Sequence, residues 1–379
     1  MLLRRNRLDY PEITRAQGHY LYDGDDRAFY DLISGFGTVF LGHCDKAVVE
    51  AVHQQMQQYS AIGRLPSEIR RRCFEQINQL LPGSHGLDVI GSTGMESNEY
   101  AGKLAAVVSG KQRFIAFENT MHGKSVFTSS LSWQNAPVKC GQNVLLPFPT
   151  EETEEDVLTM LADCLKSGDF AGCYLEPLRG SCDGAIASLT FREQLVALCK
   201  QHGVVSIFDE TLTGLYRTGP LFMASELSQF PDILIFAKSI GNGVPASCVA
   251  SNIAQVHHQR ALKGSTFSDN PVACAAILAT LEAITERIQP NEISRVEQTF
   301  VGFQNRLEQY GCELRGKGLL WVLACRSEAQ ANHFFDTLIS HNYLVSKFGE
   351  NIRFLPKMNT EASTIESVLS LLLTQAKVG

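Results

Sequence analysis

The sequence predicts an α/β protein in which helices cover both faces of a mainly parallel sheet, with a smaller α+β unit at the carboxyl end. Two observations support this prediction. The middle of the chain alternates short, continuously apolar runs with amphipathic helical patterns, which is typical of a sheet buried on both faces. After Pro271 long helical segments dominate, with only short apolar runs between them, which indicates a separate unit.

Six apolar runs in the middle of the chain are predicted strands, and the stretches between them include three predicted helices. The strands are expected at 87–92, 113–117, 144–148, 172–177, 204–209 and 233–237, and the helices at 96–108, 154–167 and 190–202. Sheets of this kind bind ligands beyond the carboxyl ends of their strands. The residues that follow these runs are therefore the first place to look for a site.

The carboxyl-terminal unit is expected to be helical, with one pair of strands. The helices are predicted at 272–287, 294–310, 328–340 and 364–376, and the strands at 319–324 and 352–355. Near the amino terminus, LYDGDDRAFYDL has two apolar runs around Asp23-Gly24-Asp25, the pattern of a hairpin. We expect residues 45–271 to form the large domain, and residues 1–44 to pack with 272–379 as the small one.

Composition excludes several classes of function. The chain has 379 residues, 44% of them hydrophobic, and its 33 Lys and Arg against 40 Asp and Glu give a formal net charge of −7. This balance predicts no nucleic-acid or membrane partner. No apolar run is long enough to span a bilayer, and the amino terminus lacks the apolar stretch of a secretory signal. Eleven scattered Cys indicate reduced thiols in a cytoplasmic protein, and no Cys/His spacing suggests a metal site.

Three segments lie where a parallel sheet presents ligands. Gly91-Ser92-Thr93-Gly94-Met95-Glu96 follows a predicted strand and opens a predicted helix, so its N–H groups can bind an anion. Asp209 and Glu210 close the strand at 204–209, where a buried carboxylate needs a cationic partner. Each segment also has an ordinary interpretation, as a helix cap for the first and as an ion pair or cap for the second.

The third segment contains Lys238, which follows the strand at 233–237 and precedes the glycine-rich turn Gly241-Asn242-Gly243. Desolvation there lowers the pKa of the amine and makes it a nucleophile, although a single lysine is more often a surface residue. An anion cradle, a carboxylate and a strand-end lysine together form the set that pyridoxal 5'-phosphate (PLP) requires. The phosphate needs the cradle, the ring nitrogen the carboxylate, and the aldehyde the lysine.

Several motifs in order resemble the class III (ornithine/ω-amino acid type) aminotransferases of PLP fold type I. They are TGMESNEYAGKLA, FENTMHGKS, YLEPLRG, IFDETLTGLYRTG, PDILIFAKSIGNGVP, GSTFSDNP and RGKGLL, and they cover nearly the whole chain. The resemblance implies a seven-stranded type of sheet in the large domain. It also implies a homodimer with shared active sites.

The resemblance further implies a role for individual residues. Lys238 forms the Schiff base with PLP, Asp209 pairs with the ring nitrogen, and Glu176 lies in the polar network around the cofactor. The remaining implied roles are phosphate contacts from Gly94 and Met95, a phosphate contact from Thr266 across the dimer, ring packing by the Met121-His122 segment, and a substrate-carboxylate clamp by Arg353 in NIRFLPKM.

Four positions depart from the family pattern. Met121 stands where an aromatic residue usually stacks on the ring, and Leu212 stands where Gln often contacts the ring hydroxyl. Ser181 replaces an acidic residue of the subgroup that acts on ornithine and γ-aminobutyrate. Arg179 stands where Gln is common and is a candidate for recognising an acidic group. The first two departures concern cofactor binding, and the last two concern the substrate.

We therefore predict transfer of an amino group between an amine or amino acid and a keto acid or aldehyde. Two alternatives remain at this stage. An aminomutase or decarboxylase of the same fold would use the same residues, because the sequence does not fix which bond breaks. A PLP-fold protein without catalysis, serving as a binding partner, is disfavoured by the intact Lys238 and Asp209.

Overall fold

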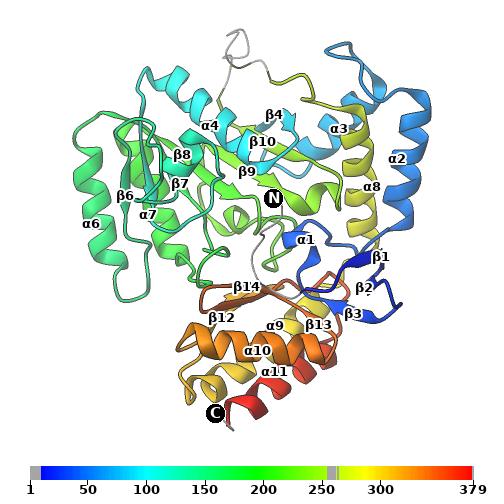
Figure 1. The fold of residues 1–379 in the computed structure, drawn as a ribbon. Coiled ribbons are helices and arrows are strands. Elements are labelled where there is room, and N and C mark those ends of the chain that lie inside the picture. The colour runs from blue at the N-terminus through cyan, green and yellow to red at the C-terminus, as the bar shows by residue number, and fades with distance from the viewer. Residues whose placement is uncertain (1–9, 254–261, 263, 378–379) are drawn as a thin grey trace.

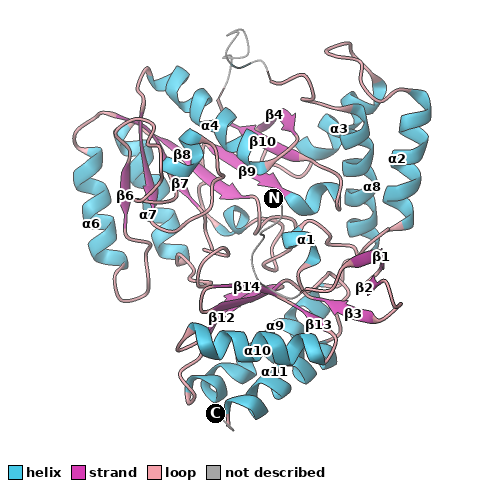
Figure 2. Ribbon diagram, in the orientation of Figure 1, coloured by secondary structure: helices cyan, strands magenta, loops and turns pink. Residues whose placement is uncertain are grey.

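A computed structural model describes residues 10–253, 262 and 264–377 of the chain. A large α/β unit lies above a smaller unit that holds the carboxyl-terminal helices (Figure 1). The sheets and the helices that cover them can be followed by colour in Figure 2.

The large unit is built on a seven-stranded sheet with the strand order β4-β10-β9-β8-β7-β5-β6. All neighbouring strands pair in parallel except β10, which is antiparallel to both β4 and β9. The mainly parallel sheet expected from the sequence is therefore confirmed. Its strands are β4 (Gly86–Gly91), β5 (Arg113–Phe117), β6 (Val144–Leu146), β7 (Phe170–Leu175), β8 (Val205–Glu210), β9 (Ile233–Ala237) and β10 (Ser247–Ser251).

Each face of this sheet has its own hydrophobic core, because side chains alternate along the strands. In β5, Phe114 and Ala116 pack with α4, whereas Ile115 and Phe117 belong to the core formed with α3, α6, α7 and α8. Burial on both faces explains why the strands read as continuous apolar runs. The helices of this unit are α2 (Lys46–Gln58), α3 (Glu68–Asn78), α4 (Gly94–Ser109), α5 (Val126–Ser130), α6 (Glu154–Leu165), α7 (Leu189–His202) and α8 (Pro271–Arg287), with the short 3-10 helices η1 (Met223–Glu226) and η2 (Lys238–Gly241).

The smaller unit packs three helices against an antiparallel sheet with the strand order β11-β12-β15-β14. The predicted pairing of the two apolar runs is confirmed, because β12 and β15 are direct neighbours. Its elements are β11 (Glu313–Lys317), β12 (Leu320–Ala324), β14 (Ser346–Phe348), β15 (Asn351–Phe354), α9 (Pro290–Glu308), α10 (Glu328–Ser340) and α11 (Ala362–Ala376).

A third sheet joins the two ends of the chain, with the strand order β1-β2-β3-β13. The predicted hairpin is present, since β2 and β3 are antiparallel neighbours. On its other side β3 pairs in parallel with β13, so the amino-terminal segment is bound to the carboxyl-terminal unit. The elements concerned are β1 (Ile13–Gln17), β2 (Tyr20–Asp23), β3 (Ala28–Asp31) and β13 (Tyr343–Leu344), and they precede the short α1 (Ser34–Gly37).

Among the described residues, no helix is both long and apolar enough to cross a membrane.

Candidate active site

Two neighbouring parallel strands carry Asp209 and Lys238 to the same edge of the sheet. Asp209 lies at the end of β8, paired in register with Ile235 of β9, and Lys238 follows β9 directly. The backbone of Lys238 is left-handed, with a φ of 49°. Residues without glycine's freedom adopt this conformation rarely, and they often do so at functional sites.

Asp209 is a buried carboxylate that is held by three donors. Its Oδ2 accepts hydrogen bonds from Asn98 Nδ2 and His122 Nδ1, each at 2.8 Å, and its Oδ1 accepts one from Thr211 N at 3.0 Å. Burial alone would raise the pKa of this carboxyl, but the His122 and Thr211 contacts outweigh burial and lower it. Asp209 is therefore ionised at neutral pH.

Lys238 is a buried amine whose pKa is lowered to about 8. Desolvation is the main cause, and the nearby positive charge of Arg353 adds to it, while Glu176 and Asp209 act in the opposite direction. A lysine with this pKa has a substantial neutral fraction at physiological pH. It can therefore act as a nucleophile and as a proton carrier.

The amino terminus of α4 faces the same region. Thr93 caps the helix by accepting a hydrogen bond from Glu96 N at 3.2 Å, while the preceding N–H groups of Gly94 and Met95 have no acceptor within the helix. A Cβ at Gly94 would lie 2.8 Å from Thr211 Cγ2, so only glycine fits there. Unpaired N–H groups at a helix start are suited to binding a phosphate.

A cavity of about 390 Å³ brings these features together. Two buried side-chain oxygens beside it, Thr211 Oγ1 and Asn98 Oδ1, have no hydrogen-bond partner among the described residues. The predicted residues Gly94, Met95, Met121, His122 and Lys238 line the cavity. Its other lining residues are Thr38, Ser92, Thr93, Asn98, Gly123, Thr211, Ala237, Gly243, Val244, Pro245 and Ala246.

Glu176 is a second buried carboxyl near this cavity. It follows β7, and its Oε2 accepts a hydrogen bond from Met121 N at 3.0 Å. Desolvation and the negative charge of Asp209 raise its pKa to about 7. The bond to Met121 N fixes the backbone of the residue that precedes His122.

Arg353 lies in β15 and is 6% exposed, so it is not a solvated strand-end charge. Its Nη1 donates to Gly180 O at 2.9 Å, and its buried Nε has no partner among the described residues. No described carboxylate forms an ion pair with it. Desolvation lowers the pKa of Arg353 to about 10, which still leaves it charged at neutral pH.

The guanidinium of Arg179 is already hydrogen-bonded to other residues of the chain. Its guanidinium binds Asp183 through two hydrogen bonds of 2.9 and 2.6 Å and donates to Glu118 O at 3.2 Å. The partly buried Ser181 lies between Arg179 and Asp183 in the sequence. Neither Arg179 nor Ser181 lines the 390 Å³ cavity.

Leu212 belongs to a small apolar cluster between the two units, with Leu178, Met223, Leu320 and Leu355. It is packed so closely that a Cβ at Gly37 or at Gly180 would lie 2.6 Å from one of its methyl groups. The Leu212 side chain therefore makes the space near Lys238 apolar and tightly packed.

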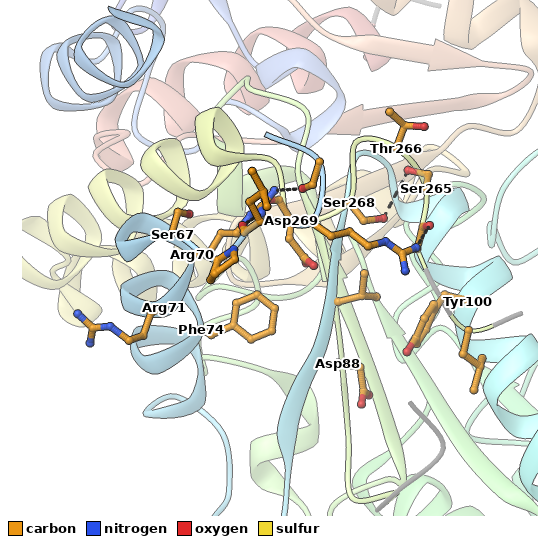
Figure 3. A pocket seen from close by; sticks show the side chains of 17 residues that line it. Ser67, Arg70, Arg71, Phe74, Asp88, Tyr100, Ser265, Thr266, Ser268 and Asp269 are labelled. Carbon is orange, nitrogen blue, oxygen red and sulfur yellow. Dashed lines mark hydrogen bonds between the residues drawn. The ribbon is translucent and has the colours of Figure 1, made fainter. Parts of the chain in front are cut away.

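Thr266 lies apart from the other predicted residues. It lines a larger, open hollow of about 790 Å³, shown in Figure 3 with side chains from α3 on one side and the loop around Ser265 and Ser268 on the other. The adjacent Phe267 is 59% exposed. Within the described part of the chain, Thr266 contributes nothing to the cavity at Lys238.

The sequence analysis missed Asn98, Thr211 and Thr38 as site residues. Asn98 lies one helical turn after Gly94, so a polar residue on the inward face of α4 was the available signal. Thr211 directly follows the two acidic residues at the end of β8. Thr38 reaches the site only through the fold, from a segment 200 residues before Lys238.

Comparison with known proteins identifies the family. The class-III aminotransferase family model matches residues 5–375 of this chain. The chain belongs to the class-III aminotransferases. The resemblance seen in the motifs is thus confirmed, and with it the predicted amino transfer.

Two relatives of this class-III aminotransferase are each 29% identical to it. One is an acetylornithine aminotransferase from Bacillus anthracis, aligned over 368 residues (95% of this chain and 93% of the relative). The other is a 2-aminoadipate transaminase from Pseudomonas putida, aligned over 396 residues (95% and 94%). A solved amine transaminase from an uncultivated Pseudomonas species has the same fold, with a TM-score of 0.90 at 22% identity, covering 99% of this chain and 97% of that one.

Class-III aminotransferases depend on PLP. The residues of this chain fit that cofactor. The helix start at Gly94 leaves N–H groups without a helical acceptor, at a position where a Cβ would meet Thr211. The ionised Asp209 suits a protonated ring nitrogen, and the cavity is lined by Asn98 and Thr211, each with a buried oxygen that has no partner among the described residues.

Proposed function

We propose that this aminotransferase holds PLP through Lys238 and moves an amino group between an amino acid and a keto acid or aldehyde. The observation that supports the proposal most strongly is the single cavity that joins Lys238 to the open amino terminus of α4 and to His122, the partner of Asp209. PLP, when bound, supplies an electron sink for the carbon that loses and gains the amino group.

In this proposal each protein group has a distinct task. Gly94 and Met95 donate backbone N–H groups to the phosphate. Asp209, kept ionised by His122 and Thr211, keeps a proton on the ring nitrogen. The Lys238 amine has a pKa of about 8. It moves a proton from the substrate carbon that bears the amino group to the carbon on the other side of the transferred nitrogen. Met121 covers the ring, and Glu176 holds Met121 through its backbone N–H.

We further propose that Arg353 binds a substrate carboxylate. A buried guanidinium without an anionic partner strongly favours an anionic ligand. The two relatives are named for acetylornithine and 2-aminoadipate, both of them amino acids, which supports an amino acid as one substrate.

Ser181 and Arg179 bear on how that carboxylate binds. Ser181 carries no charge and so forms no ion pair with Arg353, which among the described residues donates one hydrogen bond, to Gly180 O. Arg353 thus remains free in both half-reactions. In this proposal Arg179 supports the substrate site indirectly and does not bind the carboxylate itself, because its bidentate bond to Asp183 already neutralises its charge.

We propose that the active enzyme is a homodimer in which Thr266 of one subunit reaches the phosphate of the other. In support, Thr266 lines the 790 Å³ hollow, away from the cofactor cavity of its own subunit, and the next residue, Phe267, is exposed. The guanidinium of Arg70 in this hollow is already bound to the carbonyls of Asp269, Leu65 and Gly63, so it is not a free anion site.

The dimer has a direct test. Phe267→Glu should produce monomers in sedimentation velocity and weaken PLP binding at least ten-fold, since a buried charge opposes the interface. Val301→Glu, which changes an exposed residue of α9, is the matched control and should remain dimeric. A dimer that survives Phe267→Glu, with parental PLP affinity, would contradict the proposal.

A cytoplasmic location is also proposed. All eleven cysteines are free, which fits a reducing compartment.

The central experiment concerns Lys238. The protein incubated with PLP should turn yellow, and borohydride reduction followed by peptide mapping should find the label on Lys238. Lys238→Ala should abolish the label and amino transfer with every donor tested, whereas Lys347→Ala should change neither. A label on another lysine would refute the assignment.

A further inference from the structure

The short segment α1 is a left-handed turn. Ser34, Gly35 and Phe36 have φ values of 49°, 56° and 57° in succession. This conformation is unfavourable for Ser and Phe, because their Cβ atoms crowd the backbone carbonyls. Consecutive residues of this kind persist only where the surrounding structure fixes them.

The turn borders the active site. Phe36 is 62% exposed, and its ring centre lies 5.9 Å from the guanidinium carbon of Arg353. A Cβ at Gly37 would lie 3.8 Å from Lys238 Cδ. Thr38, at the end of the turn, lines the 390 Å³ cavity. Any shift of the turn would therefore move the wall that faces Arg353 and Lys238.

Asp31 holds the turn at its start. Its Oδ1 accepts hydrogen bonds from Ile33 N at 2.8 Å and from Ser34 N at 3.0 Å. The hydroxyl of Ser34 adds a bond of 2.6 Å to Leu355 O. The first left-handed residue is thus bonded through both its backbone and its side chain.

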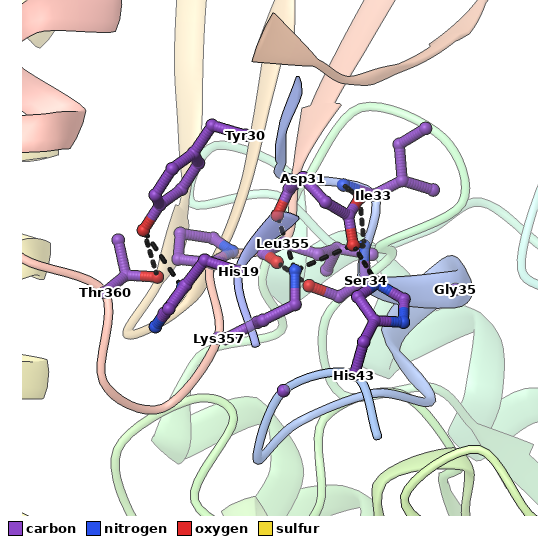
Figure 4. Close-up of polar contacts among 12 residues, drawn as sticks. His19, Tyr30, Asp31, Ile33, Ser34, Gly35, His43, Leu355, Lys357 and Thr360 are labelled. Atoms are coloured by element: carbon purple, nitrogen blue, oxygen red, sulfur yellow. Dashed lines mark hydrogen bonds and ion pairs between the residues drawn. The ribbon is translucent and has the colours of Figure 1, made fainter. Parts of the chain in front are cut away.

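Asp31 is in turn held by a buried cation from the far end of the chain. Lys357 Nζ lies 2.7 Å from both Asp31 Oδ2 and Asp31 O, and His43 Nε2 lies 2.8 Å from Oδ2. Asp31 and Lys357 are each 1% exposed. Figure 4 shows Lys357 and His43 converging on the Asp31 carboxylate, with Ser34 beside them.

We propose that Lys357 and Asp31 are positioning residues, whose ion pair fixes the left-handed turn so that Phe36 and Thr38 shape the substrate entrance beside Arg353. This role rests on the proposed function, in which Arg353 binds the substrate carboxylate. Neither residue needs to touch the substrate. Lys357 acts on Asp31, Asp31 acts on the backbone of Ile33 and Ser34, and the turn carries the effect to Phe36.

The first test reads the turn directly in the PLP-loaded protein. Chymotrypsin cuts only extended chain, so cleavage after the exposed Phe36 requires the turn to open. Lys357→Met, which removes the cation but keeps the length of the side chain, should speed this cleavage at least ten-fold without changing the rest of the cleavage map. Lys347→Met removes another largely buried lysine of the same unit and should leave cleavage at Phe36 at the parental rate.

The second test is a neutral pair. Asp31→Asn keeps an oxygen for the N–H groups of Ile33 and Ser34, so the double variant Asp31→Asn/Lys357→Met removes both charges and retains the bonds to the turn. Because each single variant leaves a buried charge unpaired, the double variant should recover protection of Phe36 to within about three-fold of the parent. It also separates loss of position from failure to fold.

The third test uses amino transfer to 2-oxoglutarate. Lys357→Met should raise KM for the keto acid about ten-fold and change kcat less than about three-fold, because the turn affects binding next to Arg353 rather than the proton transfer at Lys238. If the parent transfers no amino group, the proposed function fails, while cleavage at Phe36 still tests the ion pair. Parental cleavage and parental KM in Lys357→Met, or faster cleavage over the whole chain, would overturn the inference.

Discussion

Two arginines near the site, Arg217 and Arg353, are buried without a carboxylate partner among the described residues. Arg217 donates to Pro356 O at 2.5 Å and to Gly37 O at 3.3 Å, and burial together with Arg353 lowers its pKa to about 9. Carbonyl oxygens accept hydrogen bonds from both terminal nitrogens of Arg217, but its buried Nε has no partner among the described residues, and the carbonyls do not neutralise its charge. These two positive charges favour an anionic substrate on the side of the site where Arg353 lies.

Replacing Arg353 tests this view. Arg353→Ala should weaken the keto-acid half-reaction by about ten- to a hundred-fold, the value of a charged, bidentate contact. The absorbance of bound PLP should be unchanged, because Arg353 holds no part of the cofactor in our proposal. Stopped-flow measurement of each half-reaction decides the matter. Arg315→Ala on β11 is the control and should react at the parental rate. Parental rates in Arg353→Ala with every keto acid would show that Arg353 does not bind the substrate carboxylate.

Some of these residues could be found from the sequence and others could not. Lys238 and Asp209 follow apolar strands, and the order of a parallel sheet brings strand ends together. The pairing of His122 with Asp209 joins residues 87 positions apart, and that of Lys357 with Asp31 spans 326 positions. No periodicity reports such contacts, since they depend on how the units pack.

At the scale of elements, the strands β5 and β9 have the bounds expected from the sequence, and the other four strands predicted for the large sheet shift by a few residues. In this sheet β10 was not predicted, and β1, β11, β13 and β14 of the other two sheets were not predicted either. The five residues of β10, SCVAS, are small and follow Pro245 after a glycine-rich turn. Because β10 returns antiparallel beside β9, only the short 3-10 helix η2 and a turn separate the two strands, and the alternation of strand and long helix gives no sign of β10.

The start of α4 gives a prediction at this scale. Gly94→Ala should weaken PLP binding at least ten-fold, because the new methyl group would lie against Thr211 and displace the N–H groups that face the phosphate. Gly302→Ala in α9, where nothing lies within 4 Å of the added carbon, should bind PLP like the parent. Equilibrium titration of the apoprotein with PLP measures both. Equal affinities would remove the helix start from the proposed phosphate site.

At the scale of the whole molecule, the amino-terminal and carboxyl-terminal segments are hydrogen-bonded to each other. Leu355 N donates to Leu32 O and Met358 N donates to Phe40 O, and β3 pairs with β13. These bonds support the proposed packing of residues 1–44 with the carboxyl-terminal segment. The boundary proposed from the sequence, between a large domain of 45–271 and the segment 272–379, needs a correction, because α8 (Pro271–Arg287) packs in the core of the large unit and so places the boundary after that helix. The amino-terminal segment is thus fixed to the small domain while its turn reaches the site.

The buried carboxylates predict how stability depends on pH. Lys357 and His43 hold the pKa of Asp31 well below its usual range, despite burial. A carboxyl whose folded pKa is depressed stabilises the fold above its unfolded pKa of about 3.9, and this contribution is lost as the pH falls toward the folded pKa. Urea unfolding should therefore need less denaturant at each step below about pH 4. In Asp31→Asn the loss per pH unit should be smaller, and an unchanged slope would contradict this account.

The packing of Leu212 has a consequence for how the sequence can change. The Leu codons CUA and CUG differ from a Gln codon by one base, so from those codons the amide common in the family is a single substitution away. In this protein that step would place an amide among Leu178, Leu320 and Leu355, where none of the aliphatic side chains offers a hydrogen bond. The missing side chains at Gly37 and Gly180 do not offset this cost, because the space that they leave is already filled by the methyl groups of Leu212. A lineage carrying Leu212 can return to the common pattern only if the new amide reaches the ring hydroxyl of the cofactor, because these aliphatic neighbours offer it no hydrogen bond.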